Sequence, residues 1–329
     1  MKEDRSKPGS NPDVEVAAVP PPKSPALGET PFALLALVVG GIAIGASPIF
    51  VRLSELGPSA TAFWRVALAV PVLFLWTRIA DGRERTARRP LAYGDLLALV
   101  LAGLFFTGDI ALWHWAVGLT SVANSTLLVN LAPVFVALGG WLLFGERFSA
   151  RFVAGLAVAL AGAAMLVGWD LASDPRNILG DAAALVAAVF YASYILTVYR
   201  LRSHFSTGTI MVSSGAVTCV ALLPITILSS ENLFATTAHG WAILLGVALL
   251  SHAGGQGLIA YALAGLPVAF SSVGLLLQPV SAAVLAWTIL DETLGGWQAV
   301  GGAVVLAGRV LARRSSQPPN PEHEANGER

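Results

Sequence analysis

The sequence predicts an all-α integral membrane protein with ten transmembrane helices, arranged as two inverted five-helix repeats. Two observations predict this class. The chain of 329 residues is 55% hydrophobic and only 12% charged, whereas soluble domains carry about 25% charged residues. In addition, one run of sequence occurs twice, at a constant offset of 146 residues. Such internal repetition in a membrane chain is typical of folds built from two related halves.

The first copy of the run covers residues 122–165 and the second covers residues 268–311, with 15 of 44 positions identical. Many of these identities are Ala, Leu or Val, which this composition matches by chance. The signal comes from rarer residue types and from recurring glycines. The offset pairs Pro133 with Pro279, Trp141 with Trp287, Glu146 with Glu292, Gly155 with Gly301, and Gly162 with Gly308.

Long apolar stretches predict the individual spans. A helix needs about 20 apolar residues to cross the hydrocarbon core, and residues 236–290 alone hold two such spans without any Lys, Arg, Asp or Glu. We expect five spans in a first repeat at residues 31–169 and five in a second repeat at residues 178–314. The tails, residues 1–30 and 315–329, should be disordered and cytoplasmic.

Arginines gather in alternate loops, as they do in loops that face the cytoplasm. This pattern places both termini on the cytoplasmic side of the cytoplasmic (inner) membrane. Because each half has an odd number of spans, the second half should be upside down relative to the first. The arginines are Arg78, Arg83, Arg85, Arg88 and Arg89 after span 2, Arg147 and Arg151 after span 4, and Arg200 and Arg202 after span 6.

Two opposite charges are predicted inside the membrane. By helical rise, Arg65 in span 2 and Asp109 in span 3 lie roughly 10 Å from the same membrane face. Charged side chains at such depth usually face a cavity or a partner. Two interpretations stay open: an ion pair that only joins two helices, or two groups that meet a substrate.

Further polar and aromatic side chains fall near the same level on several spans. For any one of them, a bond to a neighbouring helix is the simpler explanation. As a set they indicate one hydrated central cavity. They are Trp113, Asn130, Tyr191, Tyr194, His252, Gln256 and Gln278. His114 is instead expected near the outer surface, within an interfacial aromatic belt.

Prolines and small or acidic residues mark further features. Pro48, Pro133 and Pro279 should break spans 1, 4 and 9, and such breaks point to a binding site or a hinge. The paired glutamates, Glu146 and Glu292, should cap helix starts. The paired glycines should pack the bundle closely rather than form a dimer face.

Several classes of site are excluded by the motifs that the sequence lacks. It has no Walker A motif, no HExxH and no Cys/His cluster with metal spacing, so we expect no cofactor and no metal. The arginines act as topology signals, and no basic patch predicts nucleic-acid binding. The single cysteine, Cys219, cannot form an intrachain disulfide.

Short motifs complete the pattern. They are Ala46-Ser47-Pro48, Phe63-Trp64-Arg65, the run from Leu119 to Asn124, and Gly145-Glu146-Arg147, followed in the second half by Pro279, Asp291-Glu292 and Gly301. In these the chain resembles the drug/metabolite transporter superfamily, of the EamA type with ten spans, over residues 32–314. At position 291 it has Asp where that family often has Gly.

The resemblance implies export or exchange of small metabolites such as amino acids, through a cavity lined mainly by spans 1, 3, 4, 6, 8 and 9. We therefore expect a secondary transporter that works by alternating access. Its partners would be a small-molecule substrate and the lipid bilayer, and the chain would be a monomer or a weak homodimer.

The candidate residues divide by role. Arg65 would meet a substrate carboxylate or pair with Asp109, and Asp109 or His252 would carry a proton in exchange. The aromatic rings of Trp113, Tyr191 and Tyr194 would face apolar parts of the substrate. Asn130, Gln256 and Gln278 would supply hydrogen bonds.

Two other function classes are weighed against this one. An intramembrane serine hydrolase would use Ser47 and His252, but no G-x-S-x-G motif is present, and we expect no enzymatic activity. A passive channel would use the repeated halves only as a static frame. Saturable counterflow separates a carrier from a channel.

Overall fold

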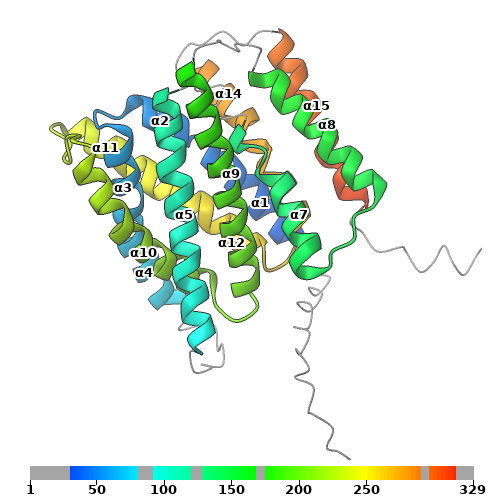
Figure 1. The fold of residues 1–329 in the computed structure, drawn as a ribbon, viewed down its shortest axis with the longest axis horizontal. Helices are drawn as coiled ribbons and strands as arrows, with labels where there is room; N and C mark the ends of the chain where they lie inside the picture. Colours follow the sequence, from blue (N-terminus) through cyan, green and yellow to red (C-terminus); the bar gives the residue numbers. More distant parts are fainter. Residues whose placement is uncertain (1–29, 81–91, 120–127, 168–174, 290–295, 316–329) are drawn as a thin grey trace, which may run out of the picture.

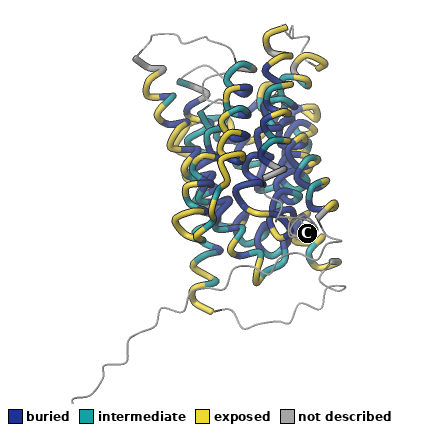
Figure 2. Tube along the Cα trace, turned by 90° about the vertical axis from the view of Figure 1, so that its right-hand side faces the viewer, coloured by how far each residue is buried: buried dark blue, intermediate teal, exposed yellow. Residues whose placement is uncertain are grey.

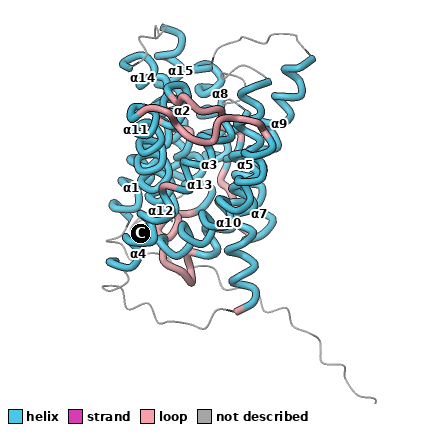
Figure 3. Tube along the Cα trace, turned by 90° about the vertical axis from the view of Figure 1, so that its left-hand side faces the viewer, coloured by secondary structure: helices cyan, strands magenta, loops and turns pink. Residues whose placement is uncertain are grey.

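The computed structural model describes residues 30–80, 92–119, 128–167, 175–289 and 296–315. Within these ranges all regular structure is helical, and Figure 1 shows the helices gathered into one bundle. Figure 3 shows loops joining them mainly near the two ends of the bundle. Seven segments are long and apolar enough to cross a membrane. An all-helical, multi-pass membrane class is therefore confirmed.

Four of the seven long spans contain consecutive helices, and three are single helices. The composite spans are α1 (Thr30–Gly45) with α2 (Ser47–Leu53), α3 (Pro58–Ala67) with α4 (Ala69–Ala80), α11 (Ala238–Gly246) with η1 (Val247–Gln256) and α12 (Gly257–Ala262), and α13 (Val268–Leu275) with α14 (Leu277–Ile289). The single helices are α5 (Tyr93–Leu119), α9 (Pro175–Leu201) and α10 (Thr207–Leu228).

Three shorter apolar helices lie where the sequence predicts spans 4, 5 and 10. They are α7 (Ala132–Phe144), α8 (Ala150–Val167) and α15 (Gly296–Ser315). Residues 120–127, where span 4 is expected to begin, lie outside the described residues. A total of ten spans therefore stays a prediction.

A proline follows each of three interruptions in the helices. Span 1 breaks at Ala46, and Pro48 lies in the first turn of α2. Pro133 is the second residue of α7, and Pro279 lies in the first turn of α14. Proline lacks the N–H that an inner turn must donate, but the first turn of a helix has no use for that donor. The prolines thus stand where the sequence expects helix breaks; a hinge role stays a prediction.

Span 8 contains a π-helical stretch, η1, that the sequence pattern does not predict. Its hydrogen bonds close wider turns than those of an α-helix. Ser251 in η1 donates a hydrogen bond of 2.9 Å to the carbonyl of Ala43 in α1. Gly40 and Gly255 let these helices approach closely, since a Cβ at Gly40 would come within 2.8 Å of the Gly255 carbonyl oxygen. The segment rotates His252 and Gln256 relative to a regular helix.

Helices α8 and α15 pack as an antiparallel pair at one side of the bundle (Figure 1). Gly155 lies against Gly308 and Gly162 against Gly301, so closely that an added Cβ would fall within 2.8 Å and 2.7 Å of the respective carbonyl oxygens. Small residues permit such contact. The two helices begin at positions 150 and 296, which the repeat offset relates. These glycines pack the bundle, as the sequence predicts.

Buried residues lie inside the bundle and many exposed ones lie on its outer surface (Figure 2). The exposed surface includes large apolar side chains such as Leu35, Val39 and Ile42 on α1. A membrane protein presents such side chains to lipid tails, because the bilayer core is itself apolar. The largest core cluster joins both halves and contains Leu37, Val66, Phe106, Val136, Tyr194, Ile210, Ala248 and Val268, among others.

Candidate functional site

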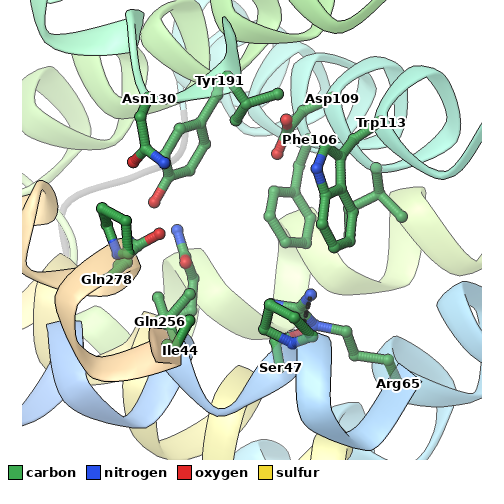
Figure 4. A pocket seen from close by; sticks show the side chains of 16 residues that line it. Ile44, Ser47, Arg65, Phe106, Asp109, Trp113, Asn130, Tyr191, Gln256 and Gln278 are labelled. Atoms are coloured by element: carbon green, nitrogen blue, oxygen red, sulfur yellow. Dashed lines mark hydrogen bonds between the residues drawn. The ribbon is translucent and has the colours of Figure 1, made fainter. Parts of the chain in front are cut away.

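One pocket lies within the bundle, with a volume of about 90 Å³. This volume is enough for several water molecules. Figure 4 shows its lining side chains pointing inward from helices of both halves. Seven of the nine predicted substrate-binding residues line it: Arg65, Asp109, Trp113, Asn130, Tyr191, Gln256 and Gln278.

Arg65 brings a positive charge to this pocket. It lies near the end of α3 and is only 7% exposed. Its guanidinium donates a hydrogen bond of 3.0 Å to the hydroxyl of Ser47, at the start of α2. Its Nε finds no hydrogen-bond partner among the described residues. Since a buried guanidinium is stabilised by full hydrogen bonding, Arg65 keeps unused donor capacity.

Asp109 brings a carboxyl group to the same pocket from α5 and is 8% exposed. Within the described ranges it forms no ion pair with Arg65, and Figure 4 shows the two side chains apart in the pocket. A direct ion pair therefore does not join spans 2 and 3. The guanidinium and the carboxyl group share one buried pocket without direct contact.

Amide and hydroxyl groups gather on another side of the pocket. Figure 4 shows the side chains of Asn130, Tyr191, Gln256 and Gln278 pointing toward one another. They come from the turn before α7, from α9, from η1 and from α14. The Nε2 of Gln278 is buried, and the part of the chain described here offers it no hydrogen-bond acceptor. This side of the pocket can donate and accept hydrogen bonds without a net charge.

The other two predicted residues, Tyr194 and His252, are not among the lining residues. Both pack against Phe106, with ring centroids 4.8 Å and 5.3 Å from it. His252 is 1% exposed, and neither ring nitrogen has a partner among the residues that the structure describes. Phe106 itself lines the pocket, so Tyr194 and His252 lie behind this ring.

The apolar part of the lining was not predicted from the sequence. Phe106 and Ile110 of α5 line the pocket beside Asp109 and Trp113. A helix places residues three, four and seven positions apart on one face. The face that carries Asp109 and Trp113 therefore also predicts Phe106, and this signal was present in the sequence.

Two expectations about single residues need correction. His114 is 3% exposed, and its Nδ1 lies 2.6 Å from the carbonyl oxygen of Ile110, so it does not belong to a surface belt. It faces the interior because its side of α5 packs within the bundle.

Glu146 does cap a helix, but that helix belongs to the other half. The carboxylate accepts hydrogen bonds from the backbone N–H groups of Val268 and Ala269, at the start of α13. Burial raises the pKa of Glu146 above its ordinary value, and the two N–H groups partly offset this shift. The corresponding prediction for Glu292 concerns a position outside the described residues.

The geometry does not favour a serine hydrolase. Nucleophilic catalysis needs a base within hydrogen-bond reach of the serine. The Ser47 hydroxyl instead accepts from Arg65, and both ring nitrogens of His252 lack any partner in the described portion of the chain. The described residues also contain no group of three or more His, Cys, Asp or Glu able to hold a metal ion.

Comparison with known families decides the identification. The model of the EamA-like transporter family matches residues 31–168 and again residues 178–314. The chain belongs to the EamA-like transporter family. This confirms the resemblance to the drug/metabolite transporter superfamily, and the two matches fall on the two halves of the chain.

Named relatives of this EamA-like protein are transporters. It is 32% identical to a probable terminal-alkyne amino-acid exporter of Streptantibioticus cattleyicolor, over 69% of this chain and 76% of the relative. It is 26% identical to the threonine/homoserine exporter RhtA of Salmonella typhimurium, over 84% and 89%. It is 27% identical to an uncharacterized transporter of Archaeoglobus fulgidus, over 80% and 91%. These relatives indicate a transporter rather than an enzyme.

A solved structure shares the fold of this EamA-like protein. The superposition has a TM-score of 0.73 and covers 88% of this chain and 99% of the other, at 19% sequence identity. At that identity the likeness concerns the fold alone.

Proposed function

We propose that this EamA-like protein is a secondary transporter of the cytoplasmic (inner) membrane that exports or exchanges a small zwitterionic metabolite of the amino-acid type. One observation carries the proposal: Arg65 and Asp109 are buried in one pocket without forming an ion pair. A buried charge is stable only when it is paired or fully hydrogen-bonded. A substrate with a carboxylate and an ammonium group would supply a partner to each residue.

The other lining residues fit the remainder of such a substrate. Asn130, Gln256 and Gln278 would bond its polar groups, and the rings of Trp113 and Tyr191 would face its apolar part. Tyr194 and His252 would act on the substrate only if Phe106 moves aside, because they lie behind that ring.

The names of two relatives support this substrate class. The terminal-alkyne amino-acid exporter and the threonine/homoserine exporter are both named for amino acids, which carry one carboxylate and one ammonium group. Both are also named as exporters, which supports outward transport here.

The proposed mechanism is alternating access between two inverted five-span halves, with both termini in the cytoplasm. Antiparallel packing of α8 and α15, whose sequences correspond in the repeat, supports the inversion. Pro48 and Pro279 line the pocket beside interrupted helices, so hinge motion there would act directly on the substrate. Because the paired glycines are used within the chain, we propose a monomer or a weak homodimer.

Proton coupling, if it drives transport, would use Asp109 first and His252 second. Asp109 lines the pocket, whereas His252 lies behind Phe106. The Asp109→Asn variant should therefore lose the pH dependence of transport, with a smaller effect of His252→Ala. Full pH dependence in both variants would remove this part of the proposal.

A thermal-shift screen of the purified protein tests the substrate class. Ligands that bind the folded state raise its stability by mass action. L-threonine, its methyl ester without the carboxylate, and the matching hydroxy acid without the ammonium group form a series. We expect a shift with threonine, a weak one with either analogue, and loss of the shift in Arg65→Ala and Asp109→Asn.

Asp95→Asn, at the start of α5, is the matched control and should keep the shift, because among the described residues Asp95 bonds only the N–H of Ala92 beside its own helix start. Equal shifts with all three compounds, or a full shift in Arg65→Ala, would contradict the zwitterion proposal. Counterflow of labelled threonine in vesicles then distinguishes a carrier, which saturates and exchanges, from a channel.

A further inference from the structure

Glu55 lies in the loop before α3, yet it caps the start of α11 in the other half. Its Oε2 accepts hydrogen bonds from the backbone N–H of Thr236 at 3.2 Å and from its hydroxyl at 2.7 Å. Its Oε1 accepts from the N–H of Thr237 at 3.3 Å and from its hydroxyl at 2.5 Å. One carboxylate thereby holds the two residues that precede α11.

Glu231 makes the corresponding contact from the second half to the first. It lies in the loop before α11, yet it caps the start of α3, accepting hydrogen bonds from the N–H groups of Ser59 at 3.3 Å and Ala60 at 2.9 Å. Each glutamate therefore caps the helix that follows the other one in the chain. Negative charge at a helix start is favourable because the first N–H groups there have no partner within the helix.

A glycine makes room for each carboxylate. A Cβ built at Gly57 would overlap the carboxyl group of Glu231, and one at Gly240 would overlap that of Glu55. Both glycines lie at the helix starts that the carboxylates cap. We name Glu55, Glu231, Gly57 and Gly240 the reciprocal clamp.

Aromatic and apolar contacts surround the clamp. The indole N–H of Trp64 donates to the carbonyl of Leu233 at 2.5 Å, and its ring meets that of Trp241 edge to face, with centroids 4.9 Å apart. Leu56 and Leu244 are buried in the same cluster. These contacts join α3 to α11 near the end of the bundle where α2 lies (Figure 1).

Helix α3 depends on this clamp more than α11 does. The residue that precedes α3, Gly57, has no side chain to cap it, whereas Thr237 itself caps α11 by accepting from the N–H of Gly240 at 2.9 Å. Helix α3 has ten residues and carries Arg65 near its end. Span 8, which begins with α11, carries Gln256.

We propose that Glu55 and Glu231 are positioning residues. Glu231 caps α3 and Glu55 caps α11, so together they hold α3 and span 8 as one unit and fix Arg65 relative to Gln256. The roles of Arg65 and Gln256 in substrate binding rest on the proposed function, whereas the clamp itself does not. Spans 2 and 8 should then move together while other contacts between the halves open and close.

Hydrogen–deuterium exchange of the full chain, without any substrate, tests the clamp. Loss of an N-cap of about 1 kcal/mol corresponds to a factor of about five in a local equilibrium. We expect Glu231→Ala to raise the exchange rate of backbone amides about fivefold in the first turn of α3. The rise should extend along α3 to the peptide that contains Arg65, and should also occur at the start of α11. Glu55→Ala should raise exchange at the same places.

Three variants separate positioning from general loss of structure. Glu231→Gln keeps one acceptor oxygen for the two N–H groups of Ser59 and Ala60, so it should restore part of the protection. Gly57→Ala keeps the charge but displaces the carboxylate, and should reproduce Glu231→Ala. Asp95→Ala removes the exposed cap of α5 and should leave both α3 and α11 unchanged.

Exchange that rises only in the capped turn, with the Arg65 peptide unchanged, would overturn the positioning role. A rise confined to α3 in one variant and to α11 in the other would show two separate caps rather than one unit. Failure of the proposed function appears elsewhere, as a missing threonine shift in the wild-type protein, and leaves the exchange comparison valid.

Discussion

Arg65 in span 2 donates a hydrogen bond of 3.0 Å to the hydroxyl of Ser47, the first residue of α2 after the break in span 1. The bond ties a charged residue of the pocket to the interrupted helix beside it. Movement of α2 would therefore displace the guanidinium of Arg65 directly. This one hydrogen bond thus contributes to stability and couples the shape of the pocket to movement of α2.

Replacement of this serine should destabilise the protein. Ser47→Ala removes the hydrogen bond from a buried cation, which corresponds to about 1.5–3 kcal/mol, and thermal unfolding in detergent should show a lower midpoint. Ser193→Ala is the matched control, because in the described part of the chain that exposed hydroxyl bonds only the Val189 carbonyl of its own helix. If both variants unfold at the same temperature, the bond to Arg65 contributes nothing.

Removal of the Phe106 ring should uncover His252. In the wild-type protein His252 is 1% exposed and should react slowly with diethyl pyrocarbonate, as followed by mass spectrometry of each histidine. Phe106→Ala should speed this modification about tenfold or more, since the Phe106 ring packs against His252 and lines the pocket, whereas His252 does not line it. Because Phe→Ala in a core loses about 3–5 kcal/mol, Phe106→Leu is the milder second variant.

The exposed His204 serves as an internal reference in both Phe106 variants, and its modification should not change. An unchanged rate at His252 alongside an intact fold would show that Phe106 is not the barrier.

The glycine contact between α8 and α15 should not accept a methyl group. A Cβ at Gly162 would lie 2.5 Å from the backbone nitrogen of Val305, so the helices must separate. Overpacking of this kind lowers the free energy of unfolding by about 1–3 kcal/mol. Gly94→Ala, whose added carbon meets nothing within 4 Å among the described residues outside its own helix turn, should leave thermal stability equal or slightly higher. Equal midpoints for the two variants would contradict the close packing.

Glu55 should make stability depend on pH in the acidic range. Hydrogen bonds from the hydroxyls of Thr237 and Thr236 lower the pKa of Glu55 from 4.5 to about 2. Because this pKa is lowered on folding, the contribution of the Glu55 carboxylate to stability is fully present above pH 4.5 and is lost as pH falls through about 2. Glu55→Gln should therefore be less stable than wild type at neutral pH, with the difference shrinking below pH 4.5.

Thr237→Val checks the cause of that pH dependence. It removes the hydroxyl that contributes most to the lowered pKa, and should weaken the pH dependence while the carboxylate remains. If the difference in unfolding free energy between wild type and Glu55→Gln stays constant from neutral to acidic pH, Glu55 is not the source of the pH dependence.

Features fixed by residue type could be predicted from the sequence. Apolar length marks the spans, the missing N–H of Pro48 and Pro279 marks helix breaks, and the absent side chains of Gly155 and Gly162 permit close packing. Depth along a span also follows from counting residues. For these reasons the sequence identified most of the polar residues that line the pocket.

Features that depend on the rotation of a helix about its axis could not be predicted. Span 8 is apolar on most sides, so its periodicity does not show which face turns inward, and the π-helical turns of η1 shift that face again. His252 has the expected depth but lies behind Phe106. The caps of Glu55, Glu146 and Glu231 join residues far apart in the chain, and no local pattern specifies such partners.

The glycine contact between α8 and α15 has a consequence for the halves as separate molecules. Each half ends in one of these helices, and each helix alone would present a shallow, glycine-lined stripe without the partner helix that packs on it. Two polypeptides made by cutting the chain between Val167 and Pro175 would carry matching stripes. Co-expressed, they should find each other in the bilayer and reassemble without the peptide link that normally joins them.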